Sequence, residues 1–342
     1  MSNIDGVIKK ARVQTPTDSY VEKYPAFVEA AELQLNKAFW RQAEIIVEKD
    51  IQDMRVHLTE AERWAVVTNL SAFLRYELFI GNEYWGGRVA KAFPRPEVER
   101  MASVFACMEL AVHAPFYDKI NKALNLADDE FYSEYKTNRS FKGRLKYINK
   151  IVDEPDDLRS LAGFVFLEGS VLYSSFALFK HFQANGKNKI TNVVRGINQS
   201  AIDENIHATA GAALFRTAME EGDYTQQYLD DMQECVIKMA HEVVEHETAI
   251  LLQTFERGEI DGYSFSDGLN FVKHRADLCL SYLGYEPIFN PEENPVAEWF
   301  YPAVTRYISN DFFTGMGREY NSDWDMAAFS EAFYKPEENI YA

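Results

Sequence analysis

Apolar residues recur at intervals of three and four along most of the chain, whereas sustained alternation of apolar and polar residues is rare. Intervals of three and four place apolar side chains on one face of an α-helix, and alternation would mark a β-strand. The pattern therefore predicts an all-α protein. The expected helices span residues 18–37, 59–86, 97–124, 129–151, 156–184, 189–221, 225–257 and 265–284.

Residues that interrupt helices separate these segments. They are Gly86-Gly87, Pro94 and Pro96, Pro155, Asn185-Gly186, Gly222 and Gly262. No internal repeat or low-complexity linker divides the chain, so we expect one helical domain over residues 1–317. The remaining segment, 318–342, has no long apolar stripe that could anchor it to a core and is expected to form a flexible C-terminal tail.

Two of the expected helices carry a glutamate inside an otherwise apolar row. The rows are Val66, Leu70, Phe73, Glu77 and Ile80 in one helix, and Leu161, Val165, Glu168, Leu172, Phe176 and Phe179 in the other. Both glutamates should therefore face the protein interior. An ionised carboxylate is costly to bury alone, so such groups are usually paired, protonated or bound to metal.

Two further helices each carry a glutamate and a histidine on one face. Glu204 and His207 are three residues apart, and Glu109 and His113 are four apart. A lone buried glutamate is more often salt-bridged, and a single such pair is common by chance. Their joint occurrence on four helices instead favours the ligand set of ferritin-like bundles that bind two iron or manganese ions. A metal pair of this kind can react with dioxygen.

Composition narrows the remaining choices. The net charge of -18 argues against binding to nucleic acid. Cys107, Cys235 and Cys279 are too far apart to suggest a zinc site or a disulfide framework, which fits a reducing cytoplasm. No signal peptide is apparent, and no stretch reaches the roughly 18 uncharged apolar residues of a membrane span. We therefore expect a soluble, cytoplasmic protein.

The six ligand candidates and their spacings resemble the small, radical-generating subunit of class I ribonucleotide reductase, a ferritin-like family, over nearly the whole chain. Trp40 lies 37 residues before Glu77, where the family has the tryptophan of its electron-transfer path. Asp203 begins the sequence DENIH, similar to a family motif whose aspartate links that tryptophan to a metal-bound histidine. Tyr117, four residues after His113, matches the family's radical tyrosine.

This resemblance implies an oxidoreductase subunit that works as a homodimer. Two metal ions, with iron first and Mn/Fe or Mn/Mn as alternatives, would activate dioxygen and generate a tyrosyl or metal-based radical. The radical would pass through Trp40 and aromatic residues of the tail to a separate large subunit, where ribonucleotides are reduced to deoxyribonucleotides. Tyr334 is the preferred relay residue of the docking tail and Tyr341 the second choice. The need for a flavoprotein activator stays open.

The chain departs from the family pattern at two ligand positions. Glu77 stands where the family often has aspartate, a substitution also seen in members that use manganese with iron. Glu109 and His113 enclose three residues, whereas the family has two between them. Either a local π-bulge brings Glu109 inward, or the site is short by one carboxylate.

Three other interpretations remain. The same bundle could be a ribonucleotide-reductase-like ligand-binding oxidase, in which Trp40, Asp203 and the tail would have no role. It could also be a ferritin-like metal storage protein, which would assemble into a cage of many subunits. A structural helical protein without metal is the third alternative.

Overall fold

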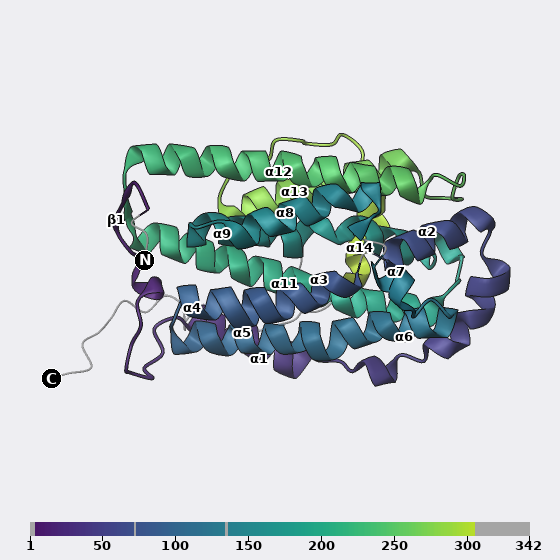
Figure 1. The fold of residues 1–342 in the computed structure, drawn as a ribbon, viewed down its shortest axis with the longest axis horizontal. Helices are drawn as coiled ribbons and strands as arrows, with labels where there is room; N and C mark the ends of the chain where they lie inside the picture. The colour runs from purple at the N-terminus through teal and green to yellow at the C-terminus, as the bar shows by residue number, and fades with distance from the viewer. Residues whose placement is uncertain (1–3, 72, 134–135, 305–342) are drawn as a thin grey trace.

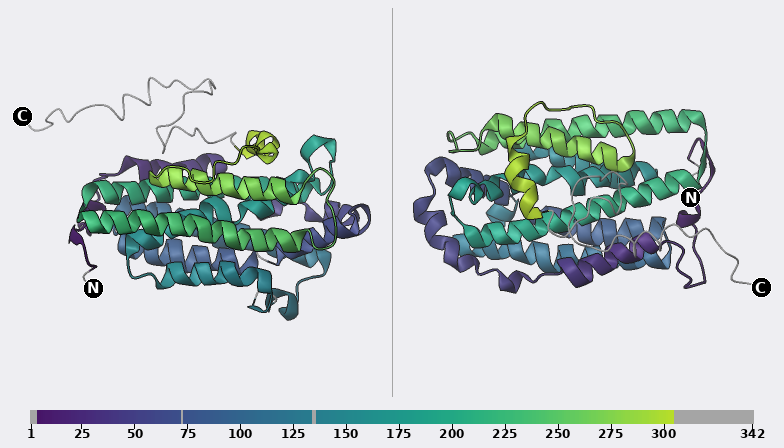
Figure 2. Two further views of the ribbon diagram at one scale, coloured as in Figure 1. Left: turned by 90° about the horizontal axis from the view of Figure 1, so that it is seen from above. Right: turned by 180° about the vertical axis from the view of Figure 1, so that it is seen from behind.

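Long helices lie side by side along the longest axis of the molecule, and α14 (Pro295–Val304) crosses them steeply (Figure 1, Figure 2). The computed structural model describes residues 4–71, 73–133 and 136–304. Within these ranges, the named strands are β1 (Val7–Lys9) and β2 (Asp223–Tyr224), which form one antiparallel pair. The all-α prediction is thus confirmed.

The other α-helices, in chain order, are α1 (Pro25–Leu33), α2 (Glu60–Leu70), α3 (Leu74–Phe79), α4 (Ala90–Ala92), α5 (Pro96–Met108), α6 (Ala114–Leu124), α7 (Asp129–Ser133), α8 (Lys142–Asp153), α9 (Asp157–Phe166), α10 (Tyr173–His181), α11 (Thr191–Glu221), α12 (Gln226–Thr254) and α13 (Phe265–Leu283). The π-helical segments are η2 (Gln34–Ala38), η5 (Asp53–His57), η6 (Ile80–Val89), η7 (Glu109–His113) and η10 (Leu167–Val171). Short 3-10 turns are η1 (Arg12–Gln14), η3 (Gln42–Glu44), η4 (Val47–Asp50), η9 (Arg139–Phe141) and η11 (Ala184–Gly186).

Local capping signals set several helix ends. Thr59 and Glu62 form a capping box at the start of α2, and Ser264 and Asp267 form another at the start of α13. The helix α6 ends at Leu124 and is capped by Asn125, whose φ of 62° is left-handed, a conformation that asparagine tolerates. These boundaries agree with the sequence prediction to within a few residues.

Three expected helices need correction. The first begins only at Pro25, because proline suits the first position of a helix. The second is divided into α2 and α3, with Ser71 as the C-cap of α2. It then runs through Gly86-Gly87 as η6 and stops at Ala92, because Phe93 precedes a proline and is not helical (φ -127°, ψ 68°). The helix expected over 129–151 is interrupted, and Asn138 caps the turn η9 that leads into α8.

The run α9–η10–α10 forms the centre of the core and packs against α11 and α13. By length and composition, Asp157–His181 could also cross a membrane, with a mean hydropathy of 1.5. All of that apolar window is buried inside the protein, as expected for a core helix. The proposed tail, 318–342, with Tyr334 and Tyr341, lies outside the described residues.

A buried ion pair joins α8 to α12 beside this core helix. The Arg144 guanidinium donates to the Glu247 carboxylate at 2.7 Å (Nη2 to Oε1), and the Ser174 hydroxyl donates to the same carboxylate at 2.6 Å. The side chains of Arg144 and Glu247 are only 4% and 0% exposed. If one of the two side chains is removed by mutation, water therefore cannot reach the other and take the place of its partner.

Arg144→Met is therefore expected to lower the free energy of unfolding by about 3–5 kcal/mol, because Glu247 keeps a buried charge without a cation. Chemical denaturation of the two proteins measures the difference. Lys150→Met is the matched control, since its ion pair with Glu242 also joins α8 to α12 but is 35% and 29% exposed. That variant should lose less than about 1 kcal/mol, and equal losses would contradict the prediction.

Candidate metal centre

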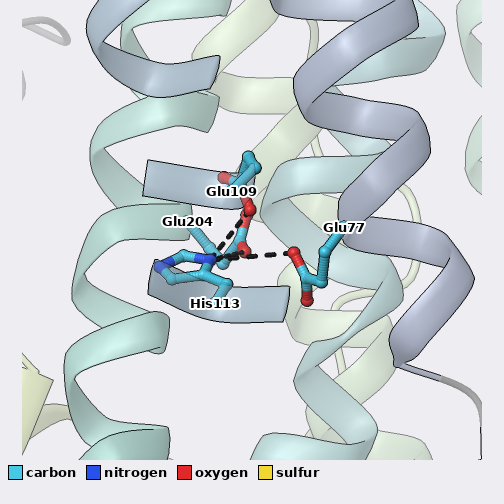
Figure 3. Close-up of side chains that lie close together, drawn as sticks. All are labelled: Glu77, Glu109, His113 and Glu204. Atoms are coloured by element: carbon cyan, nitrogen blue, oxygen red, sulfur yellow. Dashed lines mark ion pairs between the residues drawn. The ribbon is translucent and has the colours of Figure 1, made fainter. Parts of the chain in front are cut away.

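Six buried side chains meet in the interior of the bundle. They are Glu77 on α3, Glu109 and His113 on η7, Glu168 on η10, and Glu204 and His207 on α11. These are the six residues proposed as ligands from the sequence, and the fold brings all of them together. Figure 3 shows the carboxylates of Glu77, Glu109 and Glu204 converging on the imidazole of His113.

The six residues form two overlapping groups, each able to surround one ion. The first group consists of Glu77, Glu109, His113 and Glu204. The second group consists of Glu109, Glu168, Glu204 and His207. Within each group, one ligand atom from every residue lies within 4.8 Å of those from the others. Glu109 and Glu204 belong to both groups, so their carboxylates are placed to bridge two ions.

Nitrogen atoms of both histidines face this carboxylate cluster. Nδ1 of His113 lies 2.8 Å from Oε2 of Glu109 and 3.4 Å from Oε1 of Glu204. Nδ1 of His207 lies 2.8 Å from Oε1 of Glu109 and 3.7 Å from Oε2 of Glu168. Neither Nδ1 atom has a partner with proper hydrogen-bond geometry. Both atoms are thus available as ligands.

Unsatisfied oxygen atoms make the strongest argument that metal belongs here. Both carboxylate oxygens of Glu77, Glu109 and Glu204, and one oxygen of Glu168, are buried without a hydrogen-bond partner. Buried polar atoms in native proteins nearly always have a hydrogen-bond partner. The concentration of unpaired carboxylate oxygens at this place therefore indicates a site for a bound cation. Two divalent cations would balance four carboxylates, and oxygen with imidazole suits iron or manganese.

Burial and the charges of neighbouring side chains shift the pKa values of these groups. Burial, reinforced by the charge of Glu109, raises the pKa of Glu77 and Glu204 well above the usual carboxylate value. Burial alone would lower the pKa of His207, but Glu109 and Glu168 raise it to about 9. Protons therefore neutralise the cluster when no metal is bound, and metal ions would displace them.

The segment η7 explains how Glu109 reaches the cluster. It is a π-helical turn that begins at Glu109 and ends at His113, at the position where a π-bulge was considered from the sequence. The turn holds one more residue than an α-helical turn, so a spacing of four still turns both side chains inward. Gly81 on η6 permits the close approach, because a Cβ there would lie 2.9 Å from Cβ of Glu109.

Side chains from three other elements hold the turn that carries Glu168. The carbonyl groups of Leu167, Gly169 and Val171 in η10 accept hydrogen bonds from Tyr76 (2.7 Å), Arg275 (2.7 Å) and Arg144 (3.1 Å), respectively. A π-helical turn disturbs the regular backbone ladder, and buried carbonyls need other donors. These donors were not anticipated, because no local sequence pattern links them to η10.

A hydrogen-bonded chain leads from the cluster to Trp40. Oδ2 of Asp203 lies 2.8 Å from Nε2 of His113 and accepts a hydrogen bond from the Trp40 indole at 2.8 Å. The Trp40 and His113 rings are also stacked, with centroids 5.9 Å apart. Gln34, which the sequence did not single out, donates to the other oxygen of Asp203 at 2.8 Å and fixes its orientation.

Tyr117 is fully buried beside the first group. Its ring stacks on Phe73 with centroids 4.3 Å apart and contacts Phe116 at 5.2 Å. Its hydroxyl has no hydrogen-bond partner. Burial, followed by the charge of Glu77, raises the pKa of Tyr117 well above 10, so the phenol keeps its proton. An apolar and shielded phenol next to the candidate metal centre matches its expected position.

Comparison with known families adds an independent observation. A model of the family described as "Ribonucleotide reductase, small chain" matches residues 19–295. The chain belongs to the ribonucleotide reductase small-chain family. The match covers all six candidate ligands together with Trp40, Tyr117 and Asp203. The family resemblance expected from the sequence is thus confirmed, and with it membership of an oxidoreductase family whose small subunits bind a dinuclear metal centre.

Individual members of the ribonucleotide reductase small-chain family are distant in sequence. A probable ribonucleoside-diphosphate reductase small subunit of invertebrate iridescent virus 6 is 24% identical over 88% of this chain and 93% of its own length. The subunit beta of ribonucleoside-diphosphate reductase 2 of Escherichia coli is 27% identical over 66% of this chain and 69% of its own length.

Solved structures of ribonucleotide reductase small subunits share the fold. The dimanganese(II)-NrdF of Streptococcus sanguinis aligns with a TM-score of 0.73 and 21% identity, covering 85% of this chain and 99% of that one. The R2 subunit of Clostridium botulinum aligns with the same TM-score and identity, covering 88% and 95%. The expected ferritin-like helical fold is thereby confirmed.

Proposed function

We propose that this chain is the radical-generating subunit of a class I ribonucleoside-diphosphate reductase. The observation that best supports this proposal is the pair of overlapping, buried ligand groups, whose carboxylate oxygens lack hydrogen-bond partners. These groups lie beside Tyr117, and Asp203 connects them to Trp40 through hydrogen bonds. When bound, a metal pair would supply dioxygen activation and one-electron oxidation. The protein residues hold, orient and insulate that chemistry.

Each residue has a defined part in this proposal. Glu77 and His113 would bind one ion, and Glu168 and His207 would bind the other. Glu109 and Glu204 would contribute to both ions. Tyr117 would hold the radical, and its apolar surroundings exclude the water and solutes that would quench it. Asp203 keeps the Trp40 indole and the His113 imidazole in contact, which favours a reductase over the oxidase alternative, where this link has no role.

For the metals, we propose iron first, with Mn/Fe and Mn/Mn as alternatives. The ligand atoms are carboxylate oxygens and imidazole nitrogens, which accept iron and manganese alike. The dimanganese form named for the Streptococcus sanguinis protein keeps manganese among the candidates. Glu77 in place of aspartate is a further reason to compare the metals directly.

We propose that the segment 318–342 docks on the large subunit, with Tyr334 as the relay residue. The small-chain family works with a large subunit and forms dimers. Leu78 and Leu110, 53% and 38% exposed, give α3 and η7 an outward apolar face suited to a second copy. Reduction of ribonucleotides would take place on the large subunit.

Elemental analysis with electron paramagnetic resonance tests the proposed function. After loading with iron or manganese and exposure to oxygen, the wild type should hold two ions per chain and show a radical signal. Tyr117→Phe should keep the metal and lose the tyrosyl signal, because only the phenol oxygen is removed. An unchanged signal in Tyr117→Phe, or less than one ion per chain in the wild type, would refute the assignment.

A further inference from the structure

The Tyr117 hydroxyl has a buried polar neighbour that the proposed function does not use. This neighbour is Ser200, which lies on α11 and is 0% exposed. Within the described ranges, neither Oγ of Ser200 nor the phenol oxygen of Tyr117 has a partner with proper hydrogen-bond geometry. Buried hydroxyls are nearly always paired in native proteins. Each of these two hydroxyls is therefore free to become the partner of the other.

The face of α11 that carries Ser200 lies against Tyr117 and its neighbour. Ser200 is one turn before Glu204, whose charge acts on the Tyr117 phenol. One turn before Ser200, Gly196 packs so closely against the Phe116 ring that a Cβ there would have no room. Phe116 directly precedes Tyr117, and the centroids of their rings are 5.2 Å apart. Ser200 thus occupies the middle of a helix face with contacts to this region on both sides.

The Ser200 hydroxyl also acts on the phenol of Tyr117 itself. Burial and the charge of Glu77 raise the pKa of Tyr117, whereas a hydrogen bond from Ser200 opposes this rise. The ring contacts of Tyr117 are with phenylalanine side chains, which offer no hydrogen bond. Asn121, one turn further along α6, acts on Tyr132 instead. Ser200 is therefore a neutral hydrogen-bonding group placed at the phenol oxygen.

On the basis of the proposed function, we infer that Ser200 donates a hydrogen bond to the oxygen of Tyr117 when that residue carries the radical. Oxidation of Tyr117 transfers one electron and the phenol proton to the metal pair, and the remaining oxygen can only accept hydrogen bonds. A serine hydroxyl can rotate to direct its hydrogen at this oxygen. The bond also satisfies a buried donor that otherwise has no acceptor. Ser200 exchanges neither the electron nor the proton, so it is a positioning residue.

High-field electron paramagnetic resonance of the full chain, loaded with iron or manganese and exposed to oxygen, tests the inference without turnover. A hydrogen bond to the oxygen of a tyrosyl radical lowers its largest g value. In heavy water, the bonded deuteron also adds a coupling that electron-nuclear double resonance detects. The wild type should show both effects. At equal metal content, Ser200→Ala should have a higher largest g value and no such coupling. Alanine favours helix formation more than serine does, so α11 should be retained.

Ser160→Ala is the matched control. Ser160 is also 0% exposed, but it lies on α9 and donates to the carbonyl of Ile151 at 2.8 Å. Removal of this hydroxyl should leave the radical spectrum of the wild type unchanged. A shift in Ser160→Ala as large as that in Ser200→Ala would contradict the inference, because the loss of any buried hydroxyl would then have the same effect.

The outcomes separate this inference from the proposed function. A tyrosyl signal with the same g values and the same deuteron coupling in the wild type and in Ser200→Ala would overturn the inference and leave Tyr117 as the radical site. A loaded wild type without any tyrosyl signal would refute the proposed function, and the inference with it. If Ser200→Ala does not fold, the wild type in heavy water decides. A deuteron coupling at hydrogen-bond distance supports the inference, and its absence overturns it.

Discussion

Glu109→Ala is expected to remove both metal ions rather than one. Glu109 belongs to both groups, and its two oxygens lie 2.8 Å from the Nδ1 atoms of His113 and His207. Loss of residues that only support metal ligands already costs about 10–100-fold in affinity, so loss of a shared ligand should cost more. Elemental analysis after dialysis should find well under one ion per chain, compared with two in the wild type.

Glu77→Ala and Glu97→Ala are the controls for this experiment. Glu77 belongs only to the first group, so Glu77→Ala should keep the ion of the second group. Glu97 is also buried, but it accepts hydrogen bonds from the backbone N–H groups of Lys23 and Tyr24 next to α1, and its removal should leave metal content unchanged. Thermal melts give a second measurement, because an ion at 100 times its dissociation constant adds about 2.7 kcal/mol of stability. A Glu109→Ala protein that still gained this stability would show that Glu109 is not a shared ligand.

Trp40→Phe is expected to abolish ribonucleotide reduction in the presence of the large subunit while leaving the metal content unchanged. Phenylalanine keeps the packing against Phe116 but loses the N–H that donates to Asp203 at 2.8 Å. Turnover should fall by about 100-fold or more, which corresponds to a barrier increase of about 2.7 kcal/mol. Deoxyribonucleotide formation by the mixed subunits measures turnover, and elemental analysis confirms equal loading.

Trp64→Phe is the matched control for Trp40→Phe. The Trp64 indole also donates one hydrogen bond, to the carbonyl of Gln253 at 2.8 Å, but it lies on α2 and makes no contact with the metal groups. Its substitution should leave turnover unchanged. Full turnover in Trp40→Phe would remove the basis for an exit route through Trp40, and oxidase chemistry confined to this chain would then be the better interpretation.

The sequence revealed the parts of the site that follow helical periodicity. Glu77 and Glu168 stand out because each interrupts an apolar row, and the structure buries both. Glu204 and His207 share a face of the uninterrupted helix α11, as their spacing predicts. In these cases the side-chain direction depends only on position within a regular helix.

Contacts that depend on π-helical turns could not be predicted in the same way. Trp85 lies eight residues after Glu77, about 80° away from it around a regular α-helix, and directly before two glycines expected to end the helix. The segment η6 instead continues through them and turns Trp85 toward Glu168. The spacing of hydrogen bonds in such turns leaves no periodic trace in residue types. Arg144 and Arg275 were missed for another reason, because their partners are backbone carbonyls distant in sequence.

Asp203 and Glu204 are consecutive residues of α11 that make different contacts. Glu204 faces both metal groups, whereas Asp203 connects His113 with Trp40. A small rotation of this single turn would displace the bridging carboxylate and the indole contact together. In the proposed function, the storage of an oxidising equivalent and its release would therefore depend on the orientation of the same helical turn. A mutation in this turn that changed one would also disturb the other.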